Sequence, residues 1–142
     1  MISQKAKYAL RALLALSRAA RGESRMIGEI SREQGIPKKF LEQILLELKR
    51  AGLVTSRRGR LGGYVLARSP EEVMFGEVLR LIDGPLAPLP CLSLTAYRRC
   101  EDCRDEASCE IRHVFERVTL ATRAVLDRTS LADSLQLEDL PV

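Results

Sequence analysis

The sequence predicts a mainly α-helical fold with a small β-hairpin wing: a winged helix-turn-helix domain followed by a long dimerisation helix. The 142-residue chain has the length of one domain, and its 46% hydrophobic content suffices for one core without disulfide support. Leu, Ala, Arg and Glu dominate the composition, whereas aromatic residues make up 4% and tryptophan is absent. This composition is typical of helical proteins, so we expect few strands.

Three helices are predicted in the first third of the chain, because apolar residues recur there at helical spacing. The first spans about residues 3–20 and is followed by Gly22, and a short second helix in "MIGEISREQG" is closed by Gly35. The third follows at once, with Pro37 at its first position, and stops at Gly52. Two short helices joined by a tight glycine-containing turn form a helix-turn-helix.

The third helix is the candidate recognition helix. In a helix-turn-helix the second helix of the motif enters the major groove of DNA by its N-terminal end. Here that end carries side chains that can reach phosphates and base edges. They are Lys38, Lys39, Glu42 and Gln43.

A hairpin follows the helix-turn-helix. "LVTS" and "GYVLA" are predicted as short strands, and "RRGRLGG" between them as the turn of a DNA-binding wing. Glycine lets the backbone lie close to a sugar-phosphate strand, and arginine suits a narrow minor groove. The alternative interpretation is a flexible basic surface loop. The candidate contact residues of the wing are Arg57, Arg58, Arg60, Gly62 and Gly63.

Charge is divided unevenly along the chain. Residues 1–68 contain 15 Lys and Arg against 5 acidic residues, a balance of +10, whereas the remainder has 8 against 14, a balance of −6. This division favours binding of the first half to a polyanion, most simply double-stranded DNA. A solvated basic surface without a partner would have the same charge.

Several other classes of protein are excluded by the sequence. The apolar run "ALLAL" is far shorter than the roughly 20 residues that span a bilayer, and Arg11 and Arg18 interrupt any signal sequence. We therefore expect a cytoplasmic protein with no membrane partner. With one histidine and no nucleotide-binding motif there is no catalytic constellation, so we expect neither an enzyme nor a small-molecule substrate.

Beyond the wing the sequence predicts a fourth helix, a cysteine-rich loop and a long helix. Ser69 is a candidate N-cap with Glu72 at capping-box spacing, and the fourth helix begins near Phe75 and stops at Gly84. These limits predict three parts. They are a winged helix-turn-helix DNA-binding domain (1–84), a cysteine-rich sensor loop (85–110), and a dimerisation helix with a short C-terminal helix (111–142).

The long helix carries an apolar stripe that nothing else in the chain covers. Such a stripe predicts an antiparallel partner helix from a second copy, hence a twofold homodimer, unless the helix packs back on its own domain. Two recognition helices related by a dyad predict a pseudo-palindromic operator, with half-sites about one or two helical turns apart. The stripe consists of Ile111, Val114, Phe115, Val118, Ala121, Val125 and Leu126.

The segment "GIPKKFLEQILLELKRAGLVTSRRGRLGGYVLAR" resembles the core of the Rrf-type family of bacterial winged-helix transcription regulators. The similarity extends over nearly the whole chain, and the helix with "FLEQ" and the wing ending in "GGYVLAR" are its most characteristic features. The resemblance implies that Glu42 and Gln43 face the operator, that Arg58 enters the minor groove, and that the protein is a dimer.

All four cysteines and the only histidine lie within residues 91–113. Clustered thiols in a reducing compartment more often bind metal or sense redox than form structural disulfides. Because thiolates bind iron well and a polar loop can wrap a cluster, the spacing fits an iron-sulfur cluster, either 2Fe-2S or 4Fe-4S. The candidate ligands are Cys91, Cys100, Cys103, Cys109 and His113.

The iron-sulfur members of the family have three cysteines in this segment. The resemblance carries these ligands over to Cys91, Cys103 and Cys109. In one such member a histidine lies three residues after the last cysteine, where this chain has Arg112, but His113 lies on the same helix face. Cys100 and His113 therefore compete for the fourth place. The nitric-oxide-sensing members use an aspartate of the first helix, where this chain has Lys7, so the resemblance does not extend to their ligand set.

Other interpretations of the cysteines stay open. One is a zinc site with Cys100 and Cys103, since a two-residue gap suits tetrahedral chelation. Another is a metal-free thiol-disulfide sensor, although five nearby carboxylates do not favour a low thiol pKa. Four inert buried cysteines would be the simplest case, but their polar neighbours disfavour it. A regulator controlled by a protein partner and a small iron-sulfur electron carrier are further alternatives. We favour a regulator, most simply a repressor, in which gain or loss of the cluster shifts the two recognition helices.

Overall fold

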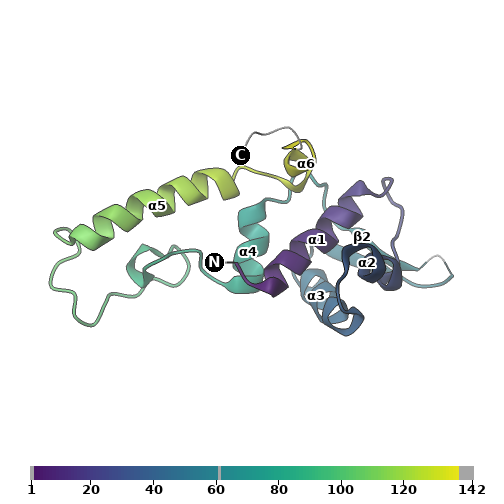
Figure 1. Ribbon diagram of the computed structural model, residues 1–142, viewed down its shortest axis with the longest axis horizontal. Helices are drawn as coiled ribbons and strands as arrows, with labels where there is room; N and C mark the ends of the chain where they lie inside the picture. Colours follow the sequence, from purple (N-terminus) through teal and green to yellow (C-terminus); the bar gives the residue numbers. More distant parts are fainter. Residues whose placement is uncertain (1, 61, 138–142) are drawn as a thin grey trace.

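The computed structural model describes residues 2–60 and 62–137, and it confirms the mainly helical fold with one antiparallel hairpin (Figure 1). Helices α1 to α3 precede the hairpin, and α4 to α6 follow it. The elements are α1 (Gln4–Arg18), α2 (Ile27–Gln34), α3 (Lys38–Arg50), β1 (Val54–Arg57), β2 (Gly63–Leu66), α4 (Phe75–Asp83), the 3₁₀ turn η1 (Pro90–Leu92), α5 (Glu110–Leu126) and α6 (Leu131–Ser134).

The core of the domain lies between α1, α3 and α4. α1 begins after Ser3, whose Oγ accepts a hydrogen bond of 3.0 Å from the backbone N–H of Ala6. α2 ends at Gly35, which adopts the left-handed conformation with φ of 65°. Pro37 lies at the N-cap of α3, one position before its predicted place. The apolar face of α3 is fully buried and consists of Leu41, Ile44, Leu45 and Leu48.

The hairpin is joined to the segment before α2. β1 and β2 pair antiparallel from Val54 opposite Leu66 to Arg57 opposite Gly63. Tyr64 also exchanges two backbone hydrogen bonds with Arg25, of 2.9 Å and 2.8 Å. The turn end of the hairpin is therefore fixed to the segment before α2, because three backbone segments pair there.

The predicted capping box at Ser69 is wrong. α4 begins at Phe75 with Met74 as its N-cap residue, and the Ser69 hydroxyl instead donates to the side chain of Glu71. The Ser69 carbonyl accepts from the N–H of Glu72, which makes the segment a turn. A serine followed by proline and acidic residues suits such a turn as well as a helix start, so the sequence pattern could not separate the two.

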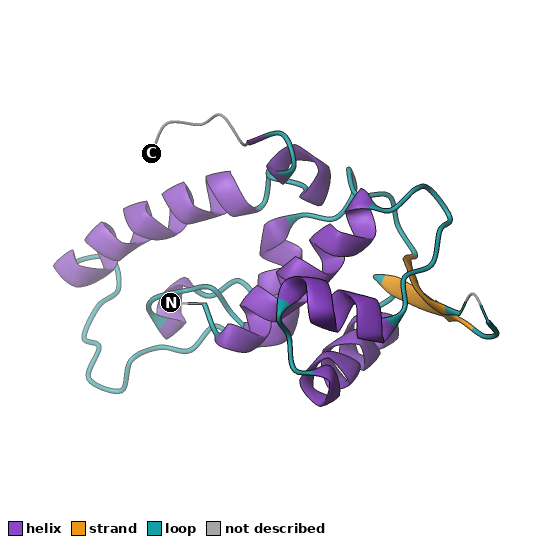
Figure 2. Ribbon diagram, turned by 45° about the vertical axis from the view of Figure 1, so that its right-hand side comes forward, coloured by secondary structure: helices purple, strands orange, loops and turns teal. Residues whose placement is uncertain are grey.

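α5 projects away from the helix-turn-helix, and the cysteine loop runs beside it (Figures 1 and 2). The hairpin and the cysteine loop therefore lie at opposite ends of the molecule. The chain then returns to the core through α6, where Leu131 is fully buried and its N–H donates to the carbonyl of Val73. Within the described residues, no helix is both long and apolar enough to cross a membrane.

Candidate DNA-binding face and cysteine cavity

The N-terminal half of α3 presents its polar side chains to solvent. Lys38, Lys39, Glu42 and Gln43 are all exposed, whereas the opposite face of the helix is buried in the core. This division follows from the 3.6-residue period of a helix, because the polar residues and the buried leucine and isoleucine residues fall on opposite faces. The sequence pattern therefore predicted which face of α3 is available for contact.

A groove of about 390 Å³ separates the start of α3 from the hairpin. Lys38 and Glu42 line one side of this groove, and Arg57, Gly62 and Gly63 line the other. The other candidates, Lys39, Gln43, Arg58 and Arg60, are exposed but do not line it. The start of α3 and the hairpin thus border one groove, with a cationic side chain on each side of it.

Three wing candidates have structural roles that the sequence did not reveal. The Nη1 atom of Arg57 donates a 2.7 Å hydrogen bond to the carbonyl of Gly22, which ties the hairpin to the turn between α1 and α2. A Cβ atom on Gly62 would lie 2.7 Å from the Gly59 carbonyl oxygen, too close for any other residue. Gly63 has φ of 138°, and a Cβ there would collide with the backbone of Arg25.

Arg25 positions the turn end of the hairpin and was not among the predicted residues. Its side chain is only 16% exposed and pairs with Glu29 at 3.1 Å and Glu33 at 2.6 Å. Hydrogen bonds to Glu33 and Glu29 raise the pKa of Arg25, so it stays charged. The spacing of Arg25 and Glu29, four residues apart at the start of a helix, is the sequence signal that could have identified it.

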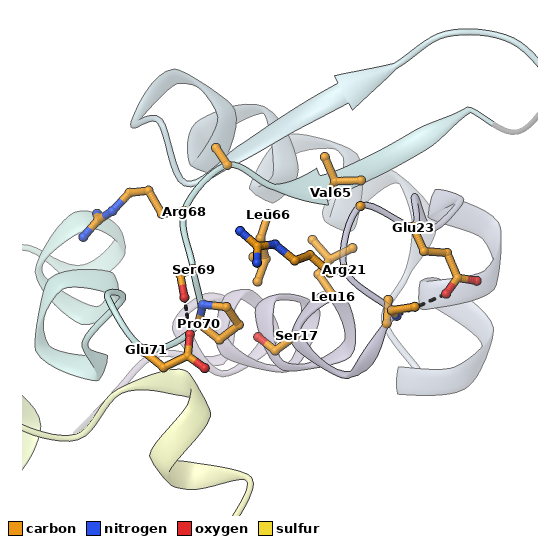
Figure 3. Close-up of a pocket in the computed structure, with 14 residues that line it drawn as sticks. Leu16, Ser17, Arg21, Glu23, Val65, Leu66, Arg68, Ser69, Pro70 and Glu71 are labelled. Atoms are coloured by element: carbon orange, nitrogen blue, oxygen red, sulfur yellow. Dashed lines mark hydrogen bonds between the residues drawn. The ribbon is translucent and has the colours of Figure 1, made fainter.

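A second hollow, of about 440 Å³, lies behind the hairpin, between the end of α1 and the turn before α4 (Figure 3). Its acidic side chains are engaged within the chain. Glu71 accepts from the Ser69 hydroxyl, which lowers the pKa of Glu71, and Glu23 accepts from the N–H of Ala20 at 3.1 Å. We assign no ligand to this hollow, and its two carboxylates serve the turns that form it.

The four cysteines lie around one cavity of about 360 Å³ between the loop and the start of α5. Cys91 in η1 is buried, Cys103 and Cys109 are half-buried, Cys100 is exposed, and all four are free thiols. Cys109 is the N-cap residue of α5, and its Sγ accepts from the N–H of Arg112 at 3.4 Å. The fold therefore brings together thiols that are up to 18 positions apart in the sequence.

His113 is placed differently from the cysteines. It lies exposed on α5 and does not line the cavity. Among the residues that the structure describes, no three His, Cys, Asp or Glu side chains gather closely enough to hold a single metal ion. The cavity is thus a shared space for four separate thiols.

The surroundings of the cavity disfavour the charged form of the Cys100 thiol. Desolvation, followed by the neighbouring charges of Cys91, Asp102, Cys103 and Cys109, raises the pKa of the Cys100 thiol. A raised thiol pKa leaves less thiolate at neutral pH and so disfavours a reactive cysteine at this position.

The exposed recognition helix and the glycine-rich wing define a winged-helix DNA-binding regulator. The chain belongs to the Rrf2 family, described as iron-dependent transcriptional regulators, and the match covers residues 2–136. This confirms the predicted family. Because members of the family regulate transcription, the protein is a regulator and not an enzyme.

Relatives and solved structures agree with this assignment. An rrf2-like HTH-type regulator of Rhodobacter capsulatus is 52% identical over 95% of this chain and 92% of its own length. The structure of CymR, the global cysteine regulator of Bacillus subtilis, superposes with a TM-score of 0.81 at 30% identity and covers 98% of both chains. The IscR structure from T. potens has a TM-score of 0.75 at 29% identity, over 96% of this chain and 86% of its own.

Proposed function

We propose that this regulator binds a pseudo-palindromic operator as a homodimer, and that an iron-sulfur cluster in the cysteine cavity controls its affinity for DNA. The observation that carries the proposal is the single cavity lined by all four thiols at the start of α5. The description of the family as iron-dependent supports the choice of iron. An operator lies on the bacterial chromosome, so the proposal also places the protein in the cytoplasm.

The donor set fits a cluster better than a zinc ion. Thiolates bound to one zinc ion each lie about 2.3 Å from the metal, so they must crowd together, and the described side chains do not. A cluster spreads its thiolate ligands over several iron atoms, which suits four separate thiols around one cavity. Cys91, Cys103 and Cys109 would serve as ligands, and Cys100 is the better fourth ligand because it lines the cavity and His113 does not.

A bound cluster would cross-link the loop to the start of α5 through chemistry that responds to iron supply and oxidants. The chain's own contacts connect this site to the DNA-binding domain. Arg123 of α5 donates a 2.7 Å hydrogen bond to the carbonyl of Leu92, next to Cys91. Further along α5, Asp127 pairs with Arg80 of α4, and α4 packs on α1 in the core. These contacts support a mechanical route from the cavity to α3.

The exposed stripe of α5 supports the homodimer. Ile111, Val118 and Val125 are 63%, 49% and 62% exposed, although they recur on one helix face. The face that α5 turns to its own chain is a different one and includes Thr119, which is buried. Of the predicted stripe, Leu126 packs against the core. The α5 helix of a second copy would cover the rest of the stripe, and a twofold axis would then relate the two recognition helices.

Anaerobic purification tests the proposal. We expect bound iron and sulfide, visible charge-transfer absorption, and a change of at least about tenfold in affinity for an operator fragment when air destroys the cluster. The Cys103→Ser variant is expected to lose both the absorption and the response to air, whereas Ser108→Ala, in the same cavity wall, keeps both. Absence of iron from the anaerobically purified wild-type protein would contradict the proposed cluster. Unchanged operator binding after replacement of all four cysteines would instead indicate a regulator controlled by a protein partner.

A further inference from the structure

Arg112 is the residue of the cysteine cavity with an unsatisfied polar group. It lies in the first turn of α5 and lines the cavity together with the four thiols. Its Nε atom is shielded from solvent and has no hydrogen-bond partner. A buried donor without a partner is costly and calls for an explanation.

Arg112 shares the cavity wall with the thiols, among them Cys91, which is the buried thiol of the set. The backbone N–H of Arg112 donates to Cys109 Sγ at 3.4 Å, so Arg112 contacts one proposed ligand directly. Arginine has five donors in a planar fork and remains charged, which lets it bind several acceptors at once.

The other arginines of the loop are placed differently. Arg99 uses its Nη2 atom for the carbonyls of Cys103 and Arg104, and so braces the loop backbone. Arg104 lines the same cavity but is exposed to solvent. Arg112 therefore combines a place in the cavity wall with a shielded donor and a contact to a thiol.

We propose that Arg112 is a positioning residue that donates hydrogen bonds to the sulfur atoms of the bound cluster and sets its reduction potential. This inference rests on the proposed function, because it needs a cluster in the cavity. The potentials of iron-sulfur clusters depend on net charge, on hydrogen bonds to sulfur and on solvent exposure. A cation beside the thiolates stabilises the more negative, reduced cluster, and hence raises the potential.

Redox titration of anaerobically purified wild-type protein, Arg112→Gln, Arg112→Lys and Arg104→Gln tests the inference. Arg112→Gln should lower the ratio of reduced to oxidised cluster at a fixed potential about tenfold, which is about 59 mV for a one-electron couple. Arg112→Lys keeps the charge but loses the fork, so we expect a smaller shift. Arg104→Gln removes the same charge from the exposed part of the wall and should shift the potential little. Circular dichroism verifies that each variant is folded.

Equal potentials in Arg112→Gln and Arg104→Gln would overturn the inference and leave the cluster in place. Loss of iron from folded Arg112→Gln alone would overturn it too, because Arg112 would then be needed for assembly and not for tuning. Wild-type protein without iron or sulfide would reject the proposed function, and the inference with it. The metal analysis of the wild type thus separates the two failures.

Discussion

Arg80 in α4 and Asp127 at the end of α5 form a bidentate ion pair, with Nη1 to Oδ1 at 2.7 Å and Nη2 to Oδ2 at 2.9 Å. The two residues are 47 positions apart, so the pair joins the long helix to the DNA-binding domain. Gly76, one turn before Arg80, leaves the room for it, because a Cβ there would collide with the Asp127 carboxylate. Position 76 therefore carries a residue without a side chain.

We predict that Asp127→Asn lowers the free energy of unfolding at neutral pH by about 0.5–1 kcal/mol. The effect is small because Asp127 is 38% exposed and solvent screens the ion pair. The hydrogen bond from Arg80 lowers the pKa of Asp127. The pKa of Asp127 in the folded protein is therefore lower than its pKa of about 3.9 in the unfolded chain. The ion pair stabilises the fold above the unfolded pKa, and this contribution is lost as the pH falls through the folded pKa. Urea unfolding should show the difference at pH 7 and none near pH 2.

Asp102→Asn is the control for this variant, because Asp102 is an exposed loop carboxylate. It should leave the unfolding midpoint within error of the wild type at both pH values. Equal effects of Asp102→Asn and Asp127→Asn would show that the ion pair contributes no stability beyond the effect of removing one negative charge.

Gly76→Ala should uncouple Arg80 from Asp127. Alanine gains about 1 kcal/mol over glycine in a helix, so the lost pair and the gained propensity nearly offset each other. The diagnostic is a double-mutant cycle: in the Gly76→Ala background, Asp127→Asn should cost nothing further. The matched control is Gly28→Ala in α2, where a Cβ would meet nothing within 4 Å and should stabilise the protein. A full cost of Asp127→Asn in both backgrounds would contradict the steric argument.

Local patterns predicted much of this fold, but not the contacts between distant segments. The apolar spacing of α3 identified its buried face, and the segment "GYVLA", predicted as a strand, contains β2. The pairing of Tyr64 with Arg25 and the return of Leu131 to the core were not predicted. Both contacts join segments about 40 or more residues apart. The periodicity of one segment does not indicate which distant segment it pairs with.

The candidate sites show the same limit. The cysteine spacing predicted a shared site, and the four thiols do line one cavity. The sequence left Cys100 and His113 as equal candidates for the fourth ligand, whereas in the fold Cys100 lines the cavity and His113 does not. Likewise, Gly62 and Gly63 were expected to admit a DNA backbone, but their surroundings are the hairpin's own carbonyl groups and Arg25. The residue types indicated which chemistry each site can perform, whereas the tertiary fold determines what each residue contacts.

Gly63→Ala is expected to damage the wing. The backbone at Gly63 has a positive φ, and a Cβ would collide with the Arg25 carbonyl, so the side chain cannot be accommodated without separating the two segments. We expect a loss of stability of about 2 kcal/mol or more and a loss of operator binding that exceeds it. Thermal unfolding and fluorescence anisotropy with labelled operator measure the two effects. Wild-type affinity in this variant would mean that wing placement does not matter for binding.

Lys39→Ala and Gln43→Ala should affect DNA binding in different ways. Lys39 is an exposed cation at the start of α3, so its loss should weaken binding to all sequences and reduce the salt slope by about 0.9. Gln43→Ala should instead relax discrimination at one base pair of each half-site, by about 1–3 kcal/mol, with an unchanged slope. Binding to operator and to mutated operators across a salt series distinguishes them. Arg128→Ala, an exposed charge beyond α5, should change neither quantity.

Val118→Glu should dissociate the proposed dimer. Val118 lies in the middle of the exposed stripe of α5, and a second α5 would bury its side chain. A glutamate there would place two unpaired carboxylates near the dyad, which costs several kcal/mol in an apolar interface. Leu120→Glu is the control, because Leu120 is also exposed but lies about 200° around the helix from Val118.

Sedimentation velocity at micromolar concentration, combined with operator binding, measures the outcome. We expect a dimer for the wild type and Leu120→Glu, and a monomer for Val118→Glu that retains the helical circular dichroism spectrum. Because a monomer engages one half-site only, its operator affinity should fall at least about a hundredfold, while binding to an isolated half-site is unchanged. A dimeric Val118→Glu protein would show that the stripe of α5 does not form the interface, and the dyad that relates the two recognition helices would then have to lie elsewhere.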